Sequence, residues 1–222
     1  MSKSLFYCII IFILTLVISI PGLSQTRTGK LGIGVDGSLQ YMLGAGATHS
    51  SPAFGGGINF SYSALENFGI RGNFCFSPLI WKGEDGISYS TDIMSLNLYA
   101  GSDLLPNSTF NIFPFIGGGI AVFSPRDSRG RQVFKDGIPQ PNFDYHIIPG
   151  LCLDWFFNEL WSASLMGEYV LTNSQYYAGR VDNNTTRDSF MRVSLQIRYY
   201  FFDPAFISKM LDAQRDRTKR SK

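Results

Sequence analysis

The sequence predicts an all-β protein, an eight-stranded antiparallel up-and-down transmembrane β-barrel. Three observations lead to this fold class: eight segments alternate apolar and polar residues, the links between them alternate in length, and an apolar leader precedes them. The composition agrees, since charged residues make up 16% and aromatic residues 15% of the 222 residues, with 23 glycines. Such a composition excludes a disordered chain and is unusual for a water-soluble helical domain.

The N-terminal residues have the pattern of a secretory signal peptide. One cation, Lys3, precedes the apolar run Leu5 to Ile20, and Pro21 and Gly22 then break the helix. The small residue Ser24 favours cleavage after it, although the run is close to the minimum for a retained membrane helix. We therefore expect a signal peptide at 1–24, a barrel at 25–202, and a basic tail at 203–222 that begins with a short amphipathic helix.

The first four alternating segments follow the leader. Each carries large apolar residues at every second position and small or polar residues between them, which predicts strands with one apolar face. They are Leu31–Leu43 with apolar residues at odd positions, then Phe54–Tyr62, Phe68–Ser77 and Met94–Tyr99 with apolar residues at even positions.

The last four segments complete the set. The fifth is the least regular, because Phe113 and Phe115 lie on the face opposite its other apolar residues and a glycine run, Gly117–Gly119, interrupts it. We expect that run to be a strand that is kinked or packed against bulky neighbours. The segments are Phe110–Val122, with apolar even positions, and Tyr145–Phe157, Trp161–Leu171 and Met191–Phe201, with apolar odd positions.

The links between the segments set the orientation. Three are short: Leu65–Asn67, Ser102–Thr109 and Asn158–Leu160. Four are long, polar and rich in glycine and proline: Gly44–Pro52, Pro78–Ser90, Ser124–Asp144 and Thr172–Arg187. Short turns on one side, long loops on the other and an even strand number are typical of outer-membrane barrels. This plan predicts a monomeric barrel with both chain ends periplasmic and, at eight strands, no continuous water pore.

The residues between the apolar positions indicate which face meets lipid. A secreted lipocalin-like barrel is the alternative, and its outer face would carry many Lys and Glu residues. Here the polar face holds mostly Gly, Ser, Asn and Gln, which suits a crowded interior. Aromatic residues near the segment ends match interfacial girdles. They are Tyr41, Phe68, Phe76, Phe110, Tyr145, Trp155, Phe157, Trp161, Tyr169 and Phe201.

These segments resemble the outer-membrane protein β-barrel domain family, the small OmpA-like barrels of Gram-negative envelopes. The resemblance is carried by FPFIGGGIAVF at Phe113–Phe123, PGLCLDWFF at Pro149–Phe157, LMGEY at Leu165–Tyr169 and MRVSLQIRYYF at Met191–Phe201. It implies location in the cell outer membrane and insertion by the assembly machinery that reads an aromatic-ended last strand. The chain departs from the pattern by continuing past Phe202, with too few residues for a peptidoglycan-binding domain.

Six charged residues lie in the inward phase. They are Asp36, Arg71, Asp154, Glu168, Arg192 and Arg198. Because buried charges must be paired, we expect them to fill the lumen as a charge-paired plug, with a proton or ion path as the alternative. If the last two strands form a hairpin closed near Thr172 and Asp188, Glu168 faces Arg192 and the two side chains pair.

No motif for chemistry occurs in the sequence. The two histidines fall at His49, in a loop, and at His146, in the inward phase. We find no metal-ligand spacing, nucleotide loop or nucleophile motif, so we expect no catalytic residue, no cofactor and no metal. Cys75 and Cys152 share the inward phase but lie on strands that are not neighbours, so a disulfide is not expected.

The sequence therefore predicts a non-enzymatic outer-membrane protein with a structural or surface-binding role. The expected partners are outer-membrane lipid and lipopolysaccharide, the assembly machinery and an unidentified surface partner. Nucleic acid is not among them, because residues 25–202 hold 12 Lys and Arg against 14 Asp and Glu. The alternatives are a small-molecule transporter with a lateral exit and a lipid-modifying enzyme. The loop residues expected to make contacts are Arg126, Arg129, Arg131, Tyr176 and Tyr177.

Overall fold

The computed structural model describes residues 29–43, 47–83, 86, 88–126, 129–131, 134–135, 138–139, 142–173, 187–201 and 208. The expected signal peptide, the tail apart from Ser208, and the loop residues Tyr176 and Tyr177 lie outside these residues. No helix in the described part is long and apolar enough to cross a membrane. The strands are β1 (Leu31–Met42), β2 (Ala47–Ser51), β3 (Ala53–Leu65), β4 (Phe68–Phe76), β5 (Leu79–Gly83), β6 (Ser88–Ser102), β7 (Phe110–Arg126), β8 (Phe134–Lys135), β9 (Ile138–Pro139), β10 (Phe143–Phe156), β11 (Trp161–Thr172) and β12 (Ser189–Phe201).

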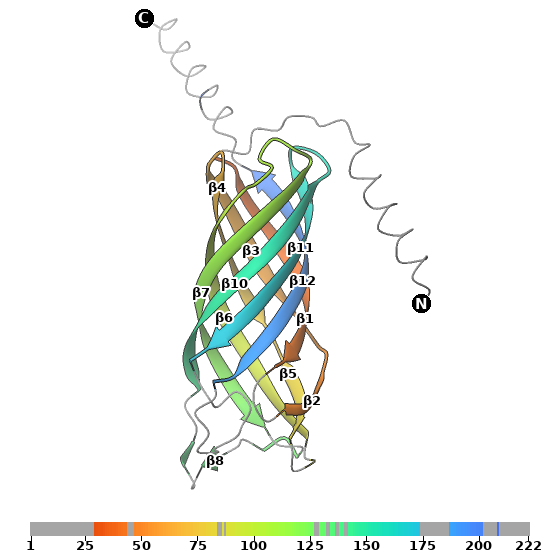
Figure 1. Ribbon diagram of the computed structural model, residues 1–222, viewed down its shortest axis with the longest axis vertical. Helices are drawn as coiled ribbons and strands as arrows, with labels where there is room; N and C mark the ends of the chain where they lie inside the picture. Colours follow the sequence, from red (N-terminus) through yellow and green to blue (C-terminus); the bar gives the residue numbers. More distant parts are fainter. Residues whose placement is uncertain are drawn as a thin grey trace, which may run out of the picture.

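Eight of these strands close into the expected antiparallel barrel (Figure 1). The order around the wall is β1, β3, β4, β6, β7, β10, β11 and β12, and each strand pairs with the next in the chain. The barrel closes where β12 pairs with β1 over its full length, from Leu31 opposite Phe201 to Met42 opposite Phe190. This closure leaves the eight-stranded wall without an open edge.

The short links gather at one end of the barrel, as the sequence predicts. The link from β3 to β4 and that from β10 to β11 lie at the end where β1 begins and β12 ends, which is the top of Figure 1. We call this the turn end. The opposite end, where the long links lie, is the loop end.

The long links contain regular structure that the sequence analysis assigns to loops. β2 lies within the expected loop Gly44–Pro52, and β5 within Pro78–Ser90. Within Ser124–Asp144, β7 continues to Arg126 and β8 pairs with β9. β4 and β5 both pair with β6, so they act as one strand interrupted at Ser77 and Pro78. The wall made by β5, β6 and β7 is therefore taller than the rest of the barrel.

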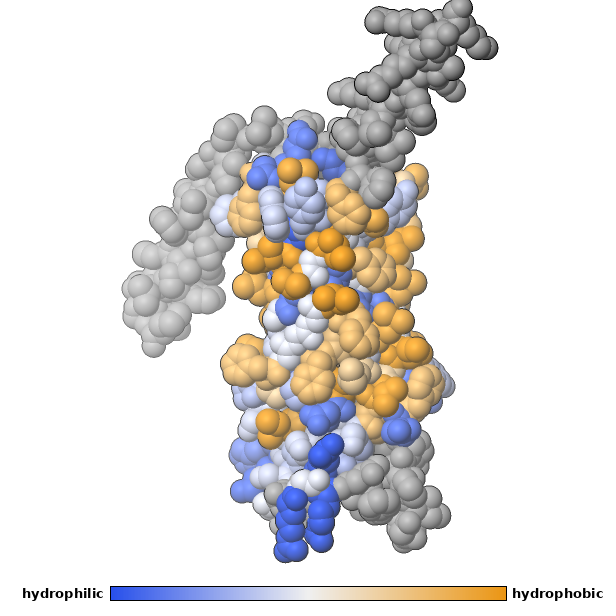
Figure 2. Space-filling model, turned by 180° about the vertical axis from the view of Figure 1, so that it is seen from behind, coloured by the Kyte–Doolittle hydropathy of each residue, from blue (hydrophilic) through white to orange (hydrophobic). Residues whose placement is uncertain are grey.

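The outer face of the barrel is apolar. Figure 2 shows hydrophobic side chains across the middle of the face that it presents, with hydrophilic residues toward both ends and most of them at the loop end. Every outward-facing residue of β1, β3, β4, β10, β11 and β12 is uncharged, and many are large apolar residues with half of their surface exposed, such as Leu195 at 62%. A soluble barrel would not expose so much apolar surface, so this face suits lipid.

Candidate functional site

The lumen is the candidate site, because most of the buried charges of the described residues meet there. A first group of charges, the turn-side layer, is centred on Asp154 of β10, whose side chain is fully buried. Arg71 of β4 binds both of its oxygens, at 3.0 and 2.6 Å, and Arg198 of β12 reaches Oδ1 at 3.2 Å. Ser164 donates to the same oxygen at 2.6 Å. One carboxylate of β10 therefore binds side chains of three other strands, β4, β11 and β12.

A second carboxylate completes the turn-side layer. Asp103, just beyond β6, lies 3.7 Å from the Arg71 guanidinium and accepts a hydrogen bond from Asn111. The Arg71 guanidinium carbon also lies 3.7 Å from the centre of the Phe113 ring, a cation–π contact. Asp103 is not among the predicted lumen charges, although two further inward steps beyond Tyr99 reach it.

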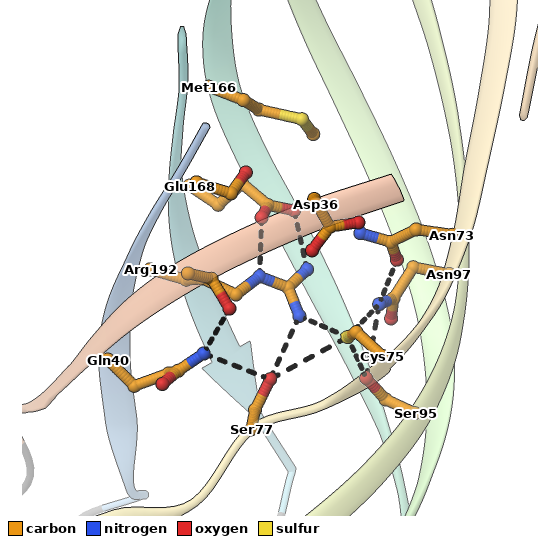
Figure 3. A network of polar contacts seen from close by, with 12 residues as sticks. Asp36, Gln40, Asn73, Cys75, Ser77, Ser95, Asn97, Met166, Glu168 and Arg192 are labelled. Atoms are coloured by element: carbon orange, nitrogen blue, oxygen red, sulfur yellow. Dashed lines mark hydrogen bonds and ion pairs between the residues drawn. The ribbon is translucent and has the colours of Figure 1, made fainter. Parts of the chain in front are cut away.

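The middle layer is built on Glu168 of β11 and Arg192 of β12, which lie opposite each other as predicted (Figure 3). The Arg192 guanidinium binds the two Glu168 oxygens at 2.5 and 2.8 Å. Tyr99 donates to Glu168 at 2.6 Å, and Arg192 reaches Ser77 at 3.3 Å and contacts the Cys75 sulfur. Both charged side chains are almost fully buried, so each depends on the other for charge neutralisation.

The glycine run of β7 makes room for this layer. A Cβ atom on Gly117 would lie 2.4 Å from the Tyr99 ring. A Cβ on Gly119 would lie 2.2 Å from Asn97 Oδ1 and 2.7 Å from His146 Nε2, two atoms that hydrogen-bond to each other at 2.6 Å. The expected packing of this run against bulky neighbours is thus present, and those neighbours belong to the polar network.

An apolar layer lies between the middle layer and the loop end. Its side chains come from the loop-side halves of the strands and from β5, whose Trp81 is 2% exposed and stacks on Tyr89 with ring centres 5.9 Å apart. The members are Met42, Leu79, Trp81, Ile93, Phe123, Ile148, Val170 and Phe190. Apolar side chains offer water no hydrogen-bond partners, so this layer makes the loop side of the lumen a poor path for water.

Five of the six lumen charges predicted from the sequence lie in these two layers. Arg71, Asp154 and Arg198 meet in one, and Glu168 and Arg192 in the other. Asp36 is partly buried and accepts a 3.5 Å hydrogen bond from Asn59, whose Oδ1 in turn accepts one from Arg198 at 2.9 Å. Figure 3 places Asp36 beside the Glu168–Arg192 pair.

The remaining reactive side chains do not form a second site. Cys75 and Cys152 are free and buried, on the non-adjacent strands β4 and β10. His146 is buried next to Asn97, whereas His49 is exposed on β2. Within the described residues, no group of His, Cys, Asp and Glu side chains could hold a metal ion.

The predicted loop contacts are only partly visible. Arg126 ends β7 with an exposed side chain, and Arg129 and Arg131 are exposed in the turn that follows. The predicted contacts Tyr176 and Tyr177 fall outside the described residues.

Comparison with known proteins identifies the fold. No protein-family model and no curated protein sequence matches the chain. The outer membrane protein OprG from Pseudomonas aeruginosa is similar in structure, with a TM-score of 0.53 at 13% identity over 81% of this chain and 99% of that one. Ail, the attachment invasion locus protein of Yersinia pestis, solved with the heparin analogue sucrose octasulfate, gives 0.50 at 12% identity over 78% and 99%. The chain therefore has the fold of the small eight-stranded outer-membrane barrels.

Proposed function

We propose that the protein is a monomeric, non-enzymatic integral membrane barrel of the cell outer membrane that keeps its lumen closed and binds partners at the loop end. The observation that carries this proposal is the filled lumen, in which two charge-paired layers are followed by an apolar layer. Carboxylates already held by arginines are poorly available as general bases or nucleophiles, and the packed side chains of the described lumen support a barrel without a continuous water path. Binding at the loop end is the role that such a scaffold supports best.

Location and export belong to the same proposal. The uncharged outer faces of six barrel strands support membrane insertion, and the leader supports export with cleavage after Ser24. Insertion would then depend on the assembly machinery that reads an aromatic-ended last strand, here ending at Phe201. Fractionation of cells with the full-length chain, followed by N-terminal sequencing, tests location and cleavage together. Recovery in the soluble periplasm would favour the lipocalin-like alternative.

The closed lumen is tested by liposome swelling. The purified barrel in vesicles should admit sugars no faster than protein-free vesicles do, while an open porin serves as the positive control. A variant in which Trp81 and Phe123 of the apolar layer are both replaced by alanine measures what that layer contributes. Rapid, size-dependent sugar entry through the wild-type protein would refute the closed-lumen proposal.

A transporter with a lateral exit is the second candidate function, and one observation favours it. Residues of β10 and β11 pair on both sides of Pro149, from His146 to Ile147 and from Gly150 to Phe156, but not at Ile148 and Pro149 themselves. Proline has no N–H to donate to the ladder. Ile148, one of the two unpaired residues, also belongs to the apolar layer. The stretch of wall without β10–β11 pairing therefore borders the apolar part of the lumen.

The lateral-exit function is tested by locking the gap. Cysteines placed at Ile147 and Leu171, which lie opposite each other at the edge of the gap, keep Pro149 and allow a disulfide across the two strands in a background without the native cysteines. Uptake of a small apolar dye into vesicles is then compared before and after reduction. Uptake that appears only in the reduced protein would support transport, and no uptake in either form would leave the binding scaffold as the function.

A further inference from the structure

Two exposed leucines lie over the lumen at the turn end. Asp103, just beyond β6, and Ser162 of β11 are the last buried residues of the inward phase on their strands at that end. Leu105 and Leu160 occupy the next inward positions, two residues further out along the chain. They are 43% and 48% exposed. Because they continue the inward phase, contact with lipid around the barrel does not account for their exposed apolar surface.

Hydrogen bonds of the backbone hold both leucines at this position. The Leu105 N–H donates to Oδ1 of Asn111 at 3.1 Å, and Asn111 is fully buried in the lumen. The Leu160 carbonyl accepts a 2.7 Å hydrogen bond from the N–H of Tyr200, near the end of β12. The two leucines therefore belong to the hydrogen-bonded end of the barrel, and we call them the end patch.

The chain leaves the barrel beside the end patch. β12 ends at Phe201 and lies next to β11 in the wall, so the tail, residues 203–222, starts near Leu160. Leu105 lies in the link between β6 and β7, two strand spacings around the wall from the link that holds Leu160, which is about 10 Å. A helix rises about 1.5 Å per residue, so about seven residues cover this distance.

The tail has an apolar face of about that length. The helix expected from the sequence begins after Asp203, and its apolar residues recur with helical spacing. They are Phe206, Ile207, Met210 and Leu211. Ser208, which the structure describes, is helical and exposed, and at 3.6 residues per turn it points away from those four residues.

The charges of the tail and of the turn end are complementary. Every charged residue of the three short links is a carboxylate, and residues 25–30 before β1 add two cations, so this end holds three carboxylates against two cations. The tail holds six Lys and Arg against three Asp. Glu159 is exposed beside Leu160. Glu66 is also exposed and accepts a 3.0 Å hydrogen bond from Asn107, two residues from Leu105. A carboxylate therefore lies near each leucine of the end patch.

We propose that the tail folds back over the turn end of its own barrel, with its apolar face covering the end patch and its cations beside Glu159 and Glu66. The occupant is this segment because it starts beside the patch, is long enough to reach both leucines and carries the opposite charge. Covering Leu105 and Leu160 would make the turn side of the lumen a poor path for water, as the apolar layer does on the loop side. The inference concerns the barrel and its tail alone and does not rest on the proposed function.

Disulfide crosslinking of the full chain, in a background without the native cysteines, tests the contact. Leu105→Cys is combined either with Met210→Cys, on the apolar face of the tail, or with Asp212→Cys, on the opposite face and at a similar distance along the chain. A disulfide needs Cβ atoms about 4 Å apart, so the first pair should oxidise at least about fivefold faster than the second. The gel mobility of unheated samples shows whether both variants are folded.

A charge reversal tests the electrostatic part of the contact. Glu159→Lys should slow the crosslink between positions 105 and 210 by about two- to fivefold, since exposed ion pairs are individually weak. Adding Lys209→Glu to the same protein should restore the rate. Asp92→Lys makes the same charge change near the loop end of β6, so it is the matched control and should leave the rate unchanged.

Four results would overturn the proposal. Equal rates with Met210→Cys and Asp212→Cys would show a tethered tail that does not dock. A crosslink between two chains would assign the end patch to a second copy. A crosslink that forms in detergent but is lost in phosphatidylglycerol vesicles would show that the tail binds the anionic membrane surface instead. Equal effects of Glu159→Lys and Asp92→Lys would show that the carboxylate beside the end patch does not attract the tail.

Discussion

Breaking the Glu168–Arg192 pair should destabilise the barrel strongly, and the two residues should not contribute independently. Removing either partner leaves a buried, unpaired charge, at a cost of about 3 to 5 kcal/mol. The double variant removes both charges, so its loss should be close to that of one single variant rather than to their sum. The coupling energy should therefore be at least about 3 kcal/mol.

The two single variants should also differ. In Glu168→Ala, Arg192 keeps hydrogen bonds to Tyr99 at 3.0 Å and to Ser77 at 3.3 Å but stays charged, because guanidinium does not deprotonate in proteins. In Arg192→Ala, Glu168 keeps the hydrogen bond from Tyr99 at 2.6 Å and can become neutral by taking up a proton. We therefore expect Glu168→Ala to be the more destabilising of the two.

Urea unfolding in lipid vesicles, followed by tryptophan fluorescence and by the gel mobility of the folded barrel, measures these free energies. Val193→Ala, which shortens a lipid-facing side chain next to Arg192 on the same strand, is the matched control and should shift the midpoint only slightly. Additive losses in the double-mutant cycle, or losses no larger than that of Val193→Ala, would refute the argument that the buried pair is mutually dependent.

Three further predictions concern the rest of the lumen. Asp154→Asn should lower the unfolding midpoint in the same urea assay, because it removes the carboxylate that neutralises two buried arginines; an unchanged midpoint would contradict the turn-side layer. Gly119→Ala should reduce the refolding yield, whereas Gly118→Ala should be tolerated, since its Cβ would meet no atom closer than 3.4 Å; equal yields would contradict the proposed role of the glycine run. Cys75 and Cys152 should resist maleimide in the folded barrel and should both react in urea without a reductant; labelling of the folded barrel, or labelling in urea only after reduction, would contradict two free, buried thiols.

The features that follow from the two-residue alternation of side chains along a β-strand were predictable from the sequence. Alternation assigns each barrel residue to a face, and counting back from the facing strand ends at Thr172 and Asp188 places Glu168 opposite Arg192. Neither step needs knowledge of how the sheet closes. The fold class follows from these local patterns together with the alternating lengths of the links.

Contacts across the lumen were not predictable in this way. Arg71 and Asp154 lie on β4 and β10, which are not neighbours in the wall, and they meet only because of the stagger with which the barrel closes. β2 and β5 were missed because they are five residues long and next to prolines, which resembles loop sequence. The signal for β5 is the apolar pair Leu79 and Trp81, whose side chains are buried.

The cross-lumen pairing of Asp154 also bears on how the chain folds. Its two arginines are 83 and 44 residues away in the sequence, so neither ion pair exists until distant strands curve toward each other. An incompletely closed sheet would have to keep these charges hydrated at the membrane surface, because burying them singly is very unfavourable. We therefore expect the final steps of insertion and closure to occur together, as one cooperative transition, with the charges entering the low-dielectric interior only when their partners arrive.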